Sequence, residues 1–163
     1  MNPREGELRM EIGNLSDNPA LVRQISEWHQ REWGHLSERT VENRIAEFAE
    51  HGTGIPLTLV AWLNGEPVGT ASLLVQDMDA HPELTPWLGS VYVLSAYRGR
   101  GIGGNLVKAA MAEAARLGVE TLYLFTEDRA GFYEKLGWEA INSFLYHGQQ
   151  VTLMQIAPRL GKG

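Results

Sequence analysis

The first third of the chain carries apolar residues at helical spacing. From residue 18 to about residue 32 they recur every three or four positions, which is typical of an amphipathic helix with one buried face. A second such pattern, Val41, Ile45 and Phe48, follows Ser37, which we expect to be its N-terminal cap. The pattern therefore predicts two consecutive helices, preceded by a weak first strand near residues 8–12.

Strand patterns dominate the rest of the chain. Residues 56–63 and 68–76 are rich in Leu, Val and Thr, and the dipeptide Asn64-Gly65 between them favours a tight hairpin turn. Gly118 and Gly137 end two further helical patterns. The remaining elements that we predict are strands over 88–94, 121–125, 139–145 and 150–156, helices over 103–117 and 130–136, and a turn at His147-Gly148.

This order of elements predicts an α/β (α+β) fold in a single domain over residues 1–163. The central sheet is expected to be mixed but mostly antiparallel, with about six or seven strands and about four flanking helices. The length of 163 residues fits one domain, and 44% apolar with 21% charged residues fits a chain that buries a core.

Charge and cysteine content exclude several classes of function. The formal charge of −6 repels nucleic acid and anionic membranes, so we expect neither as a partner. The absence of cysteine excludes disulfides, thiolate metal sites and a cysteine nucleophile. The five histidines show no metal-ligand spacing, so no metal is expected. No apolar stretch approaches the ~20 residues that span a bilayer, and by elimination we expect a cytoplasmic protein.

Residues 97–104 read Tyr-Arg-Gly-Arg-Gly-Ile-Gly-Gly and lie between a predicted strand and a predicted helix. Glycines at such a position let backbone N–H groups approach an anion, and the helix N-terminus adds partial positive charge. A turn alone requires one or two glycines and no arginine, whereas this segment has four glycines and two arginines. The segment therefore predicts a phosphate-binding loop.

A dinucleotide site is the first alternative for this loop, because Gly99, Gly101 and Gly104 formally match G-x-G-x-x-G. A dinucleotide fold turns into that motif directly from its first strand and needs several more strand–helix units afterwards. Too little chain follows Gly104 for those units. A nucleotide phosphate loop is excluded as well, because Asn105 stands where Lys would be required.

The loop resembles the acyl-coenzyme A loop of the GNAT superfamily of N-acetyltransferases, written Gln/Arg-x-x-Gly-x-Gly/Ala, which Arg98, Gly101 and Gly103 match. Upstream, Val91-Tyr92-Val93 resembles the family's fourth strand. Downstream, residues 131–138, Gly-Phe-Tyr-Glu-Lys-Leu-Gly-Trp, resemble its second signature, Phe-Tyr-x-x-Leu-Gly-Phe. The three blocks stand in the family's order, with one helix and one strand between the last two.

The resemblance implies a sheet that splays apart between its fourth and fifth strands, with the pantetheine arm of acetyl-coenzyme A lying along the exposed backbone of the fourth. Acetyl-coenzyme A would serve as the acyl donor. The residues implied in binding it are Val91, Tyr92, Val93, Arg98, Gly99, Arg100, Gly101, Ile102, Gly103 and Gly104.

Tyr133 matches the family tyrosine that gives a proton to the departing thiolate. Because the chain has no cysteine and no Gly-x-Ser-x-Gly elbow, direct attack by the acceptor in a ternary complex is the expected route. Some family members carry a glutamate base on the fourth strand, but residues 88–94 contain no carboxylate. A water chain ending on residues 77–83 or on His81 is the expected substitute.

The acceptor is expected to be a primary amine of a small molecule or a peptide. Carboxylates near aromatic rings suit an ammonium ion, and the candidate residues are Trp28, Glu32, Asp79 and Glu83. A homodimer is a further candidate assembly. Two other hypotheses stay open at this point, a non-catalytic acyl-coenzyme A-binding module and, on the glycine motif alone, a nicotinamide dehydrogenase.

Overall fold

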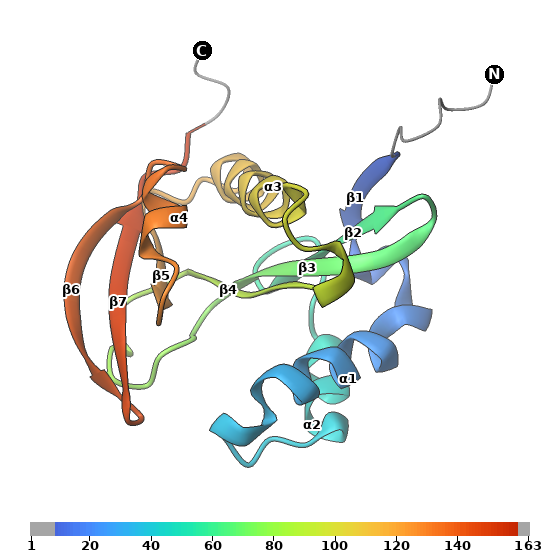
Figure 1. Cartoon of the computed structure of the whole chain (residues 1–163), viewed down its shortest axis with the longest axis horizontal. Coiled ribbons are helices and arrows are strands. Elements are labelled where there is room, and N and C mark those ends of the chain that lie inside the picture. The colour runs from blue at the N-terminus through green and yellow to red at the C-terminus, as the bar shows by residue number, and fades with distance from the viewer. Residues whose placement is uncertain (1–8, 160–163) are drawn as a thin grey trace.

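The computed structural model describes residues 9–159. Seven strands form one sheet in the order β1-β2-β3-β4-β5-β7-β6 (Figure 1). The strands are β1 (Met10–Asn14), β2 (Leu57–Leu63), β3 (Glu66–Leu74), β4 (Trp87–Val93), β5 (Leu122–Thr126), β6 (Glu139–Tyr146) and β7 (Gln149–Ile156). The α-helices are α1 (Val22–Trp33), α2 (Val41–Phe48), α3 (Ile102–Arg116) and α4 (Ala130–Glu134). The predicted α/β architecture is therefore confirmed.

The N-terminal elements differ from the prediction at their ends. The expected strand at residues 8–12 is found as β1, two residues further along, and residue 8 lies outside the described residues. Residues Pro19–Leu21 form a 3-10 turn instead of the first turn of α1. Asn18 precedes a proline and is thereby kept out of the helical region, so α1 begins only at Val22.

The cap of α2 is Thr40, and the expectation of Ser37 was wrong. Thr40 Oγ1 accepts a hydrogen bond from the Asn43 N–H at 3.1 Å, and Asn43 Oδ1 accepts one from the Thr40 N–H at 2.9 Å. This reciprocal pair satisfies two N–H groups of the helix end, which Ser37 is too far away to reach. The Ser37 hydroxyl instead accepts from the Arg39 N–H.

Both predicted hairpin turns are present. Asn64 and Gly65 have φ angles of 52° and 86°, and His147 and Gly148 have 50° and 81°. Two successive positive φ angles match the right-handed twist of paired strands, which is why Asn-Gly is such a strong signal. These turns set the registers β2–β3 and β6–β7, both antiparallel.

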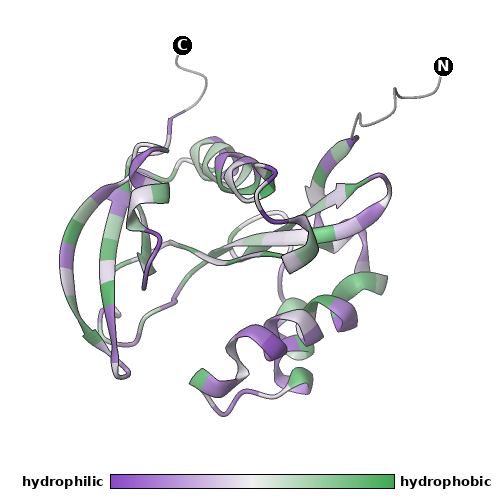
Figure 2. Ribbon diagram, in the orientation of Figure 1, coloured by the Kyte–Doolittle hydropathy of each residue, from purple (hydrophilic) through white to green (hydrophobic). Residues whose placement is uncertain are grey.

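Helices cover both faces of the sheet, with α3 and α4 on one side and α1 and α2 on the other (Figure 1). The main core lies under α3, where Leu106, Val107 and Ala110 pack on β2 and β3. A second cluster lies under α1 around Ile25 and Val60. Hydrophobic and hydrophilic residues interchange along α1 and α3 (Figure 2), as amphipathic helices on a sheet require.

The sheet is interrupted between β4 and β5. These two parallel strands share a single residue pair, Trp87↔Tyr123, next to a hydrogen bond from the Tyr123 N–H to the Pro86 carbonyl. Beyond it β4 continues beside β3 while β5 continues beside β7, and the two parts of the sheet separate (Figure 1). The splay expected between the fourth and fifth strands is present.

None of the helices within residues 9–159 combines the length and the apolar character needed to cross a membrane.

Gly69 allows β3 and β4 to approach closely. A Cβ at this position would lie 2.7 Å from the Tyr92 carbonyl oxygen and 3.0 Å from Leu106 Cδ1. We expect Gly69→Ala to lower the free energy of unfolding by ~1–3 kcal/mol, because backbone cannot move aside cheaply. Urea unfolding measures this. Gly54→Ala, where a Cβ meets nothing within 4 Å, is the control and should change little.

Candidate functional site

The free edge of β4 is the first component of the site. The Leu94 N–H donates to the Val68 carbonyl on β3 at 2.9 Å, and Tyr92 pairs with Thr70. Because backbone groups alternate in direction along a strand, Val91 and Val93 turn theirs away from β3, toward the opening beside β5. Tyr92 turns its main chain to β3, and its ring packs on Trp28 and Trp33.

The glycine loop follows this edge after a short 3-10 turn, Ser95–Tyr97. Gly99 and Gly101 both have φ 81°, a backbone conformation that side chains disfavour, and Gly101 is the N-cap of α3. The N–H groups of residues 102–104 lie in the first helical turn, where they have no partner within the helix. Ile102 is 3% exposed and anchors the loop in the main core, whereas Gly99, Arg100 and Gly101 are exposed.

Two arginines extend from this loop. Arg98 Nε donates to the Val93 carbonyl at 2.7 Å, and its guanidinium lies 5.7 Å from the centre of the Tyr92 ring. Arg100 lies 5.5 Å from the centre of the Tyr97 ring. The Arg98 bond ties the loop back to β4 and already uses the carbonyl of Val93. At the free edge of β4, the backbone groups that Arg98 does not occupy are the N–H and carbonyl of Val91 and the N–H of Val93.

Tyr133 lies on α4, on the α3 side of the opening. Its ring packs edge-on against Phe132 at 4.9 Å and near Trp138 at 6.1 Å, and the residue is 8% exposed. Burial raises the pKa of its phenol to about 12, against the effect of the nearby Arg129 charge. The phenol therefore keeps its proton across the physiological range and has a proton to donate there.

Asp77 is a residue that sequence reasoning included only as part of the segment 77–83. A Cβ on Gly89 would lie 2.8 Å from Asp77 Oδ2, so the carboxyl occupies the space that this glycine leaves on β4. Burial raises the pKa of Asp77 from 3.8 to about 7, and the charge of Arg39 opposes that shift. The glycine within the strand pattern 88–94 was the available sign of a group approaching there.

Asp77 and Tyr133 lie on opposite faces of the sheet. Leu88 belongs to the main core under α3, and Tyr133 belongs to the same cluster. Gly89 is the next residue of β4, so its Cβ direction, toward Asp77, points to the other face. The Asp77 carboxyl and the Tyr133 ring thus lie on opposite faces of the sheet.

The sequence of this chain matches the model of one protein family. The model of the acetyltransferase (GNAT) family matches residues 22–138, which is more than half of the chain. The chain belongs to this family. No curated protein matches its sequence.

Solved structures similar to this GNAT protein share its fold. One is an aminoglycoside 6'-N-acetyltransferase complexed with coenzyme A, at 19% identity and a TM-score of 0.75, covering 94% of this chain and 99% of that one. Another is YncA from Salmonella typhimurium with its cofactor acetyl-CoA, at 22% identity and 0.76, covering 95% and 97%. A third is an aminoglycoside 6'-acetyltransferase type Ii, at 23% identity and 0.71, covering 90% and 96%.

The four predicted acceptor residues lie in three different settings. Trp28 is 4% exposed and packs in the cluster under α1, so the structure places it in the core. Glu32 is exposed near the end of α1. Asp79 and Glu83 share the loop between β3 and β4, and the structure brings only this pair onto one segment.

The β3–β4 loop is attached to the β6–β7 hairpin. The Asp79 N–H donates to the Tyr146 hydroxyl at 3.1 Å, and that hydroxyl donates to Asp79 Oδ1 at 3.0 Å. Glu83 Oε2 lies 2.9 Å from His81 Nδ1, and this hydrogen bond lowers the pKa of Glu83. The contact uses Nδ1 of His81 and leaves Nε2 out of it.

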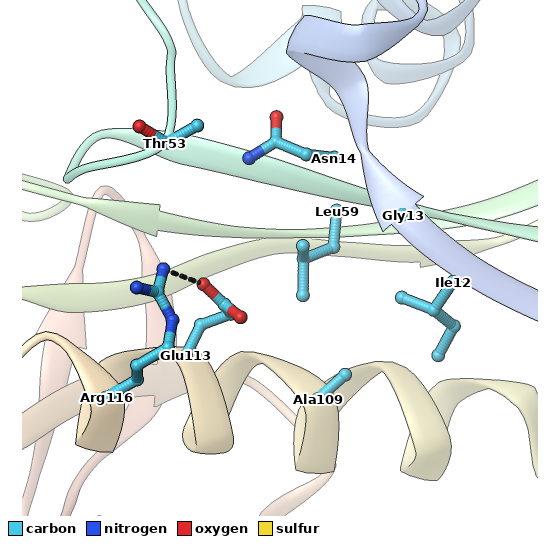
Figure 3. A pocket seen from close by; sticks show the side chains of 8 residues that line it. All are labelled: Ile12, Gly13, Asn14, Thr53, Leu59, Ala109, Glu113 and Arg116. Atoms are coloured by element: carbon cyan, nitrogen blue, oxygen red, sulfur yellow. Dashed lines mark hydrogen bonds and ion pairs between the residues drawn. The ribbon is translucent and has the colours of Figure 1, made fainter.

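A separate pocket of about 330 Å³ lies between β1, β2 and α3 (Figure 3). Glu113 and Arg116 form an ion pair of 2.6 Å at one side of it. Its lining residues are Ile12, Gly13, Asn14, Thr53, Leu59, Ala109, Glu113 and Arg116, and none of them is a predicted site residue. Within residues 9–159 the structure shows no group of three or more His, Asp or Glu side chains placed to hold a metal ion.

The raised pKa of Asp77 makes a prediction about stability. The Asp77 carboxyl holds a proton more tightly in the folded chain than in the unfolded one. The stability that this protonation adds to the folded chain is fully present below pH 3.8 and is lost as the pH rises to about 7. We expect Asp77→Asn, which never ionises, to be more stable than the wild type at pH 8, by more than at pH 5. Thermal unfolding at both values tests this, with the exposed Asp128→Asn as control; equal effects at the two pH values would contradict it.

Proposed function

We propose that this protein transfers an acetyl group from acetyl-coenzyme A to a primary amine by direct attack in a ternary complex. The observation that carries this proposal is the position of the glycine loop. It follows the free edge of β4 after one 3-10 turn, Ser95–Tyr97, and leads into the N-terminus of α3, while β4 leaves β5 after one residue pair. An extended arm beside β4 would thus end with its phosphates at the helix.

The proposed roles in binding follow from the directions of the backbone groups. The N–H and carbonyl of Val91 and the N–H of Val93 pair with the amides of the pantetheine arm, because the Val93 carbonyl already accepts from Arg98. The N–H groups of residues 102–104 and the arginine side chains face the pyrophosphate. Structures of the same fold with coenzyme A or acetyl-CoA support this assignment.

Asp77 is the proposed base. An amine with a pKa of about 10.4 is mostly protonated at pH 7, and freeing it costs ~4–5 kcal/mol unless a nearby group accepts the proton. A carboxyl with a pKa of about 7, placed against β4, is ionised often enough and basic enough for this purpose. Asp77 first takes one proton from the ammonium, directly or through water, and releases it to solvent. The free amine nitrogen then bonds to the thioester carbonyl carbon, its second proton passes to Asp77, and the carbon–sulfur bond breaks.

Tyr133 is the proposed acid. As the carbon–sulfur bond breaks, negative charge develops on a sulfur whose thiol has a pKa near 8.5. The phenol of Tyr133 carries its proton at every working pH and donates it, or a hydrogen bond, to that sulfur. Products leave as the amide and the free thiol, after which Asp77 releases its proton to solvent and Tyr133 regains one from solvent.

The acceptor side favours a cation. Asp79 and Glu83 add negative charge to the loop that also carries Asp77, and Glu32 adds more near the end of α1. The similar folds of two aminoglycoside acetyltransferases support an amine-bearing cation as acceptor. Thiol release with a panel of aminoglycosides, polyamines and peptide amines tests the proposal; binding of coenzyme A without turnover for any amine would favour the non-catalytic module instead.

The Tyr133→Phe variant separates binding from chemistry. We expect thermal stabilisation by coenzyme A to stay within about twofold of wild type and kcat to fall by at least about tenfold, because only the proton donor is removed. The control is Tyr123→Phe, which removes a phenol from β5 on the other face, beside Trp87. An unchanged kcat in Tyr133→Phe would remove the acid role.

The Asp77→Asn variant tests the base. For an acceptor with an amine pKa near 10, we expect wild-type kcat/KM to fall below about pH 7 as Asp77 takes up a proton. Asp77→Asn should lose this inflection and about a hundredfold in rate. Asp79→Asn, on the same loop, should keep the inflection. Retention of the inflection in Asp77→Asn would assign the base elsewhere.

A further inference from the structure

β4 contains a β-bulge at Ser90 and Val91. Ser72 pairs with Gly89 and Thr70 pairs with Tyr92, so two residues of β4, Ser90 and Val91, stand opposite one residue of β3. Ser90 has φ 51°, in the left-handed region that non-glycine residues avoid. Such a conformation persists only where the surroundings hold it, and a bulge bends the strand that carries it.

Two buried side chains hold this bulge. Thr70 Oγ1 donates to the Ser90 carbonyl at 2.9 Å, and His29 Nε2 lies 2.9 Å from the same Oγ1. The single hydroxyl proton is used toward Ser90, so His29 must be the donor to Thr70, which fixes the Nε2–H tautomer. Thr70 is 0% exposed and His29 is 1% exposed, so water cannot replace either bond.

His29 is itself fixed by its surroundings on α1, α2 and β4. Its ring lies 5.0 Å from Trp33, 5.8 Å from Phe48 and 6.1 Å from Tyr92, measured between ring centres. Burial and the charge of Arg44 lower the pKa of His29 to about 3. The imidazole is therefore neutral under working conditions and presents the same N–H to Thr70 throughout.

We propose that His29 and Thr70 are positioning residues for acetyl transfer, which hold the Ser90 carbonyl toward β3 and so keep the β4 bulge in the form that presents Val91 and Val93 to the coenzyme arm. This inference rests on the proposed function only where it assigns the coenzyme arm as the ligand of Val91 and Val93. The bend of β4 away from β5 and the direction of its free backbone groups both follow from the bulge.

The chain supplies a matched control. His51 Nδ1 lies 2.9 Å from Thr58 Oγ1, which lies 2.8 Å from Ser72 Oγ. Thr58 is 0% exposed, like Thr70, and belongs to the neighbouring strand β2. This second network ends on a side-chain hydroxyl, whereas the first ends on the backbone of the bulge.

The test compares Thr70→Val, Thr70→Ser and Thr58→Val. We expect Thr70→Val to speed amide hydrogen exchange in residues 87–93 by about tenfold and to raise KM for acetyl-coenzyme A by about tenfold, with KM for the acceptor within about twofold. Thr70→Ser keeps the hydroxyl and should restore both values. Thr58→Val should change neither, although its loss of thermal stability is expected to be similar.

Equal effects of Thr70→Val and Thr58→Val on exchange in residues 87–93 and on KM would overturn the proposal. So would an unchanged KM for acetyl-coenzyme A in a Thr70→Val protein whose exchange is accelerated. If Thr70→Val does not fold, His29→Leu and His29→Gln replace it, because only Gln keeps an N–H donor near the position of Nε2; His29→Gln should then retain a KM that His29→Leu loses.

A different result would show that the proposed function is wrong. Wild-type protein that neither binds coenzyme A nor releases thiol with any amine would contradict the acetyltransferase proposal. The exchange measurement needs no ligand, so it would still decide whether Thr70 holds the bulge.

Discussion

The separation of β4 from β5 shapes the whole candidate site. Parallel strands normally satisfy each other's backbone groups along their length, but here a single pair, Trp87↔Tyr123, joins them before they separate. Val91 and Val93 are left with main-chain groups that have no strand beside them. A protein tolerates such an edge inside its own sheet where something else fills it, and an extended amide chain is the complementary occupant.

Three other features converge on this opening. The glycine loop leaves β4 at its far end, and Gly101 turns it into the N-terminus of α3. Tyr133 packs in the main core on the α3 side of the sheet, and the Asp77 carboxyl lies against β4 from the α1 side, in the space beside Gly89. Burial shifts the pKa of Asp77 to about 7 and that of Tyr133 to about 12, which separates their proposed roles as base and acid.

Asp77 also illustrates a tension between stability and chemistry. A carboxyl whose pKa is raised by burial destabilises the folded chain above the pH at which it would ionise in water. Residues of this kind occur where their environment serves a reaction, although structural burial alone also produces such shifts. The contact with Gly89 at the edge of β4 adds a geometric reason to consider Asp77 a functional group.

The order of elements, both hairpin turns and the glycine loop could be predicted from local patterns, because Asn64-Gly65, Gly101 and the alternation of apolar residues act over a few residues. Element ends were less predictable: whether Ser37 or Thr40 caps α2 depends on which hydroxyl reaches an N–H. The family motifs indicated the cofactor loop and Tyr133.

Side-chain environments were decided only by the tertiary structure. Trp28, which the sequence offered as a pocket residue, is buried under α1, and Asp77 acquires its raised pKa only through burial against β4. The His29–Thr70–Ser90 network joins residues far apart in the chain, with no motif to announce it. Local patterns in the sequence were enough for the kinds of element and their order along the chain, because those follow from neighbouring residues and hydrophobic spacing. Which strands lie side by side and which groups meet across the sheet depend on packing between distant segments.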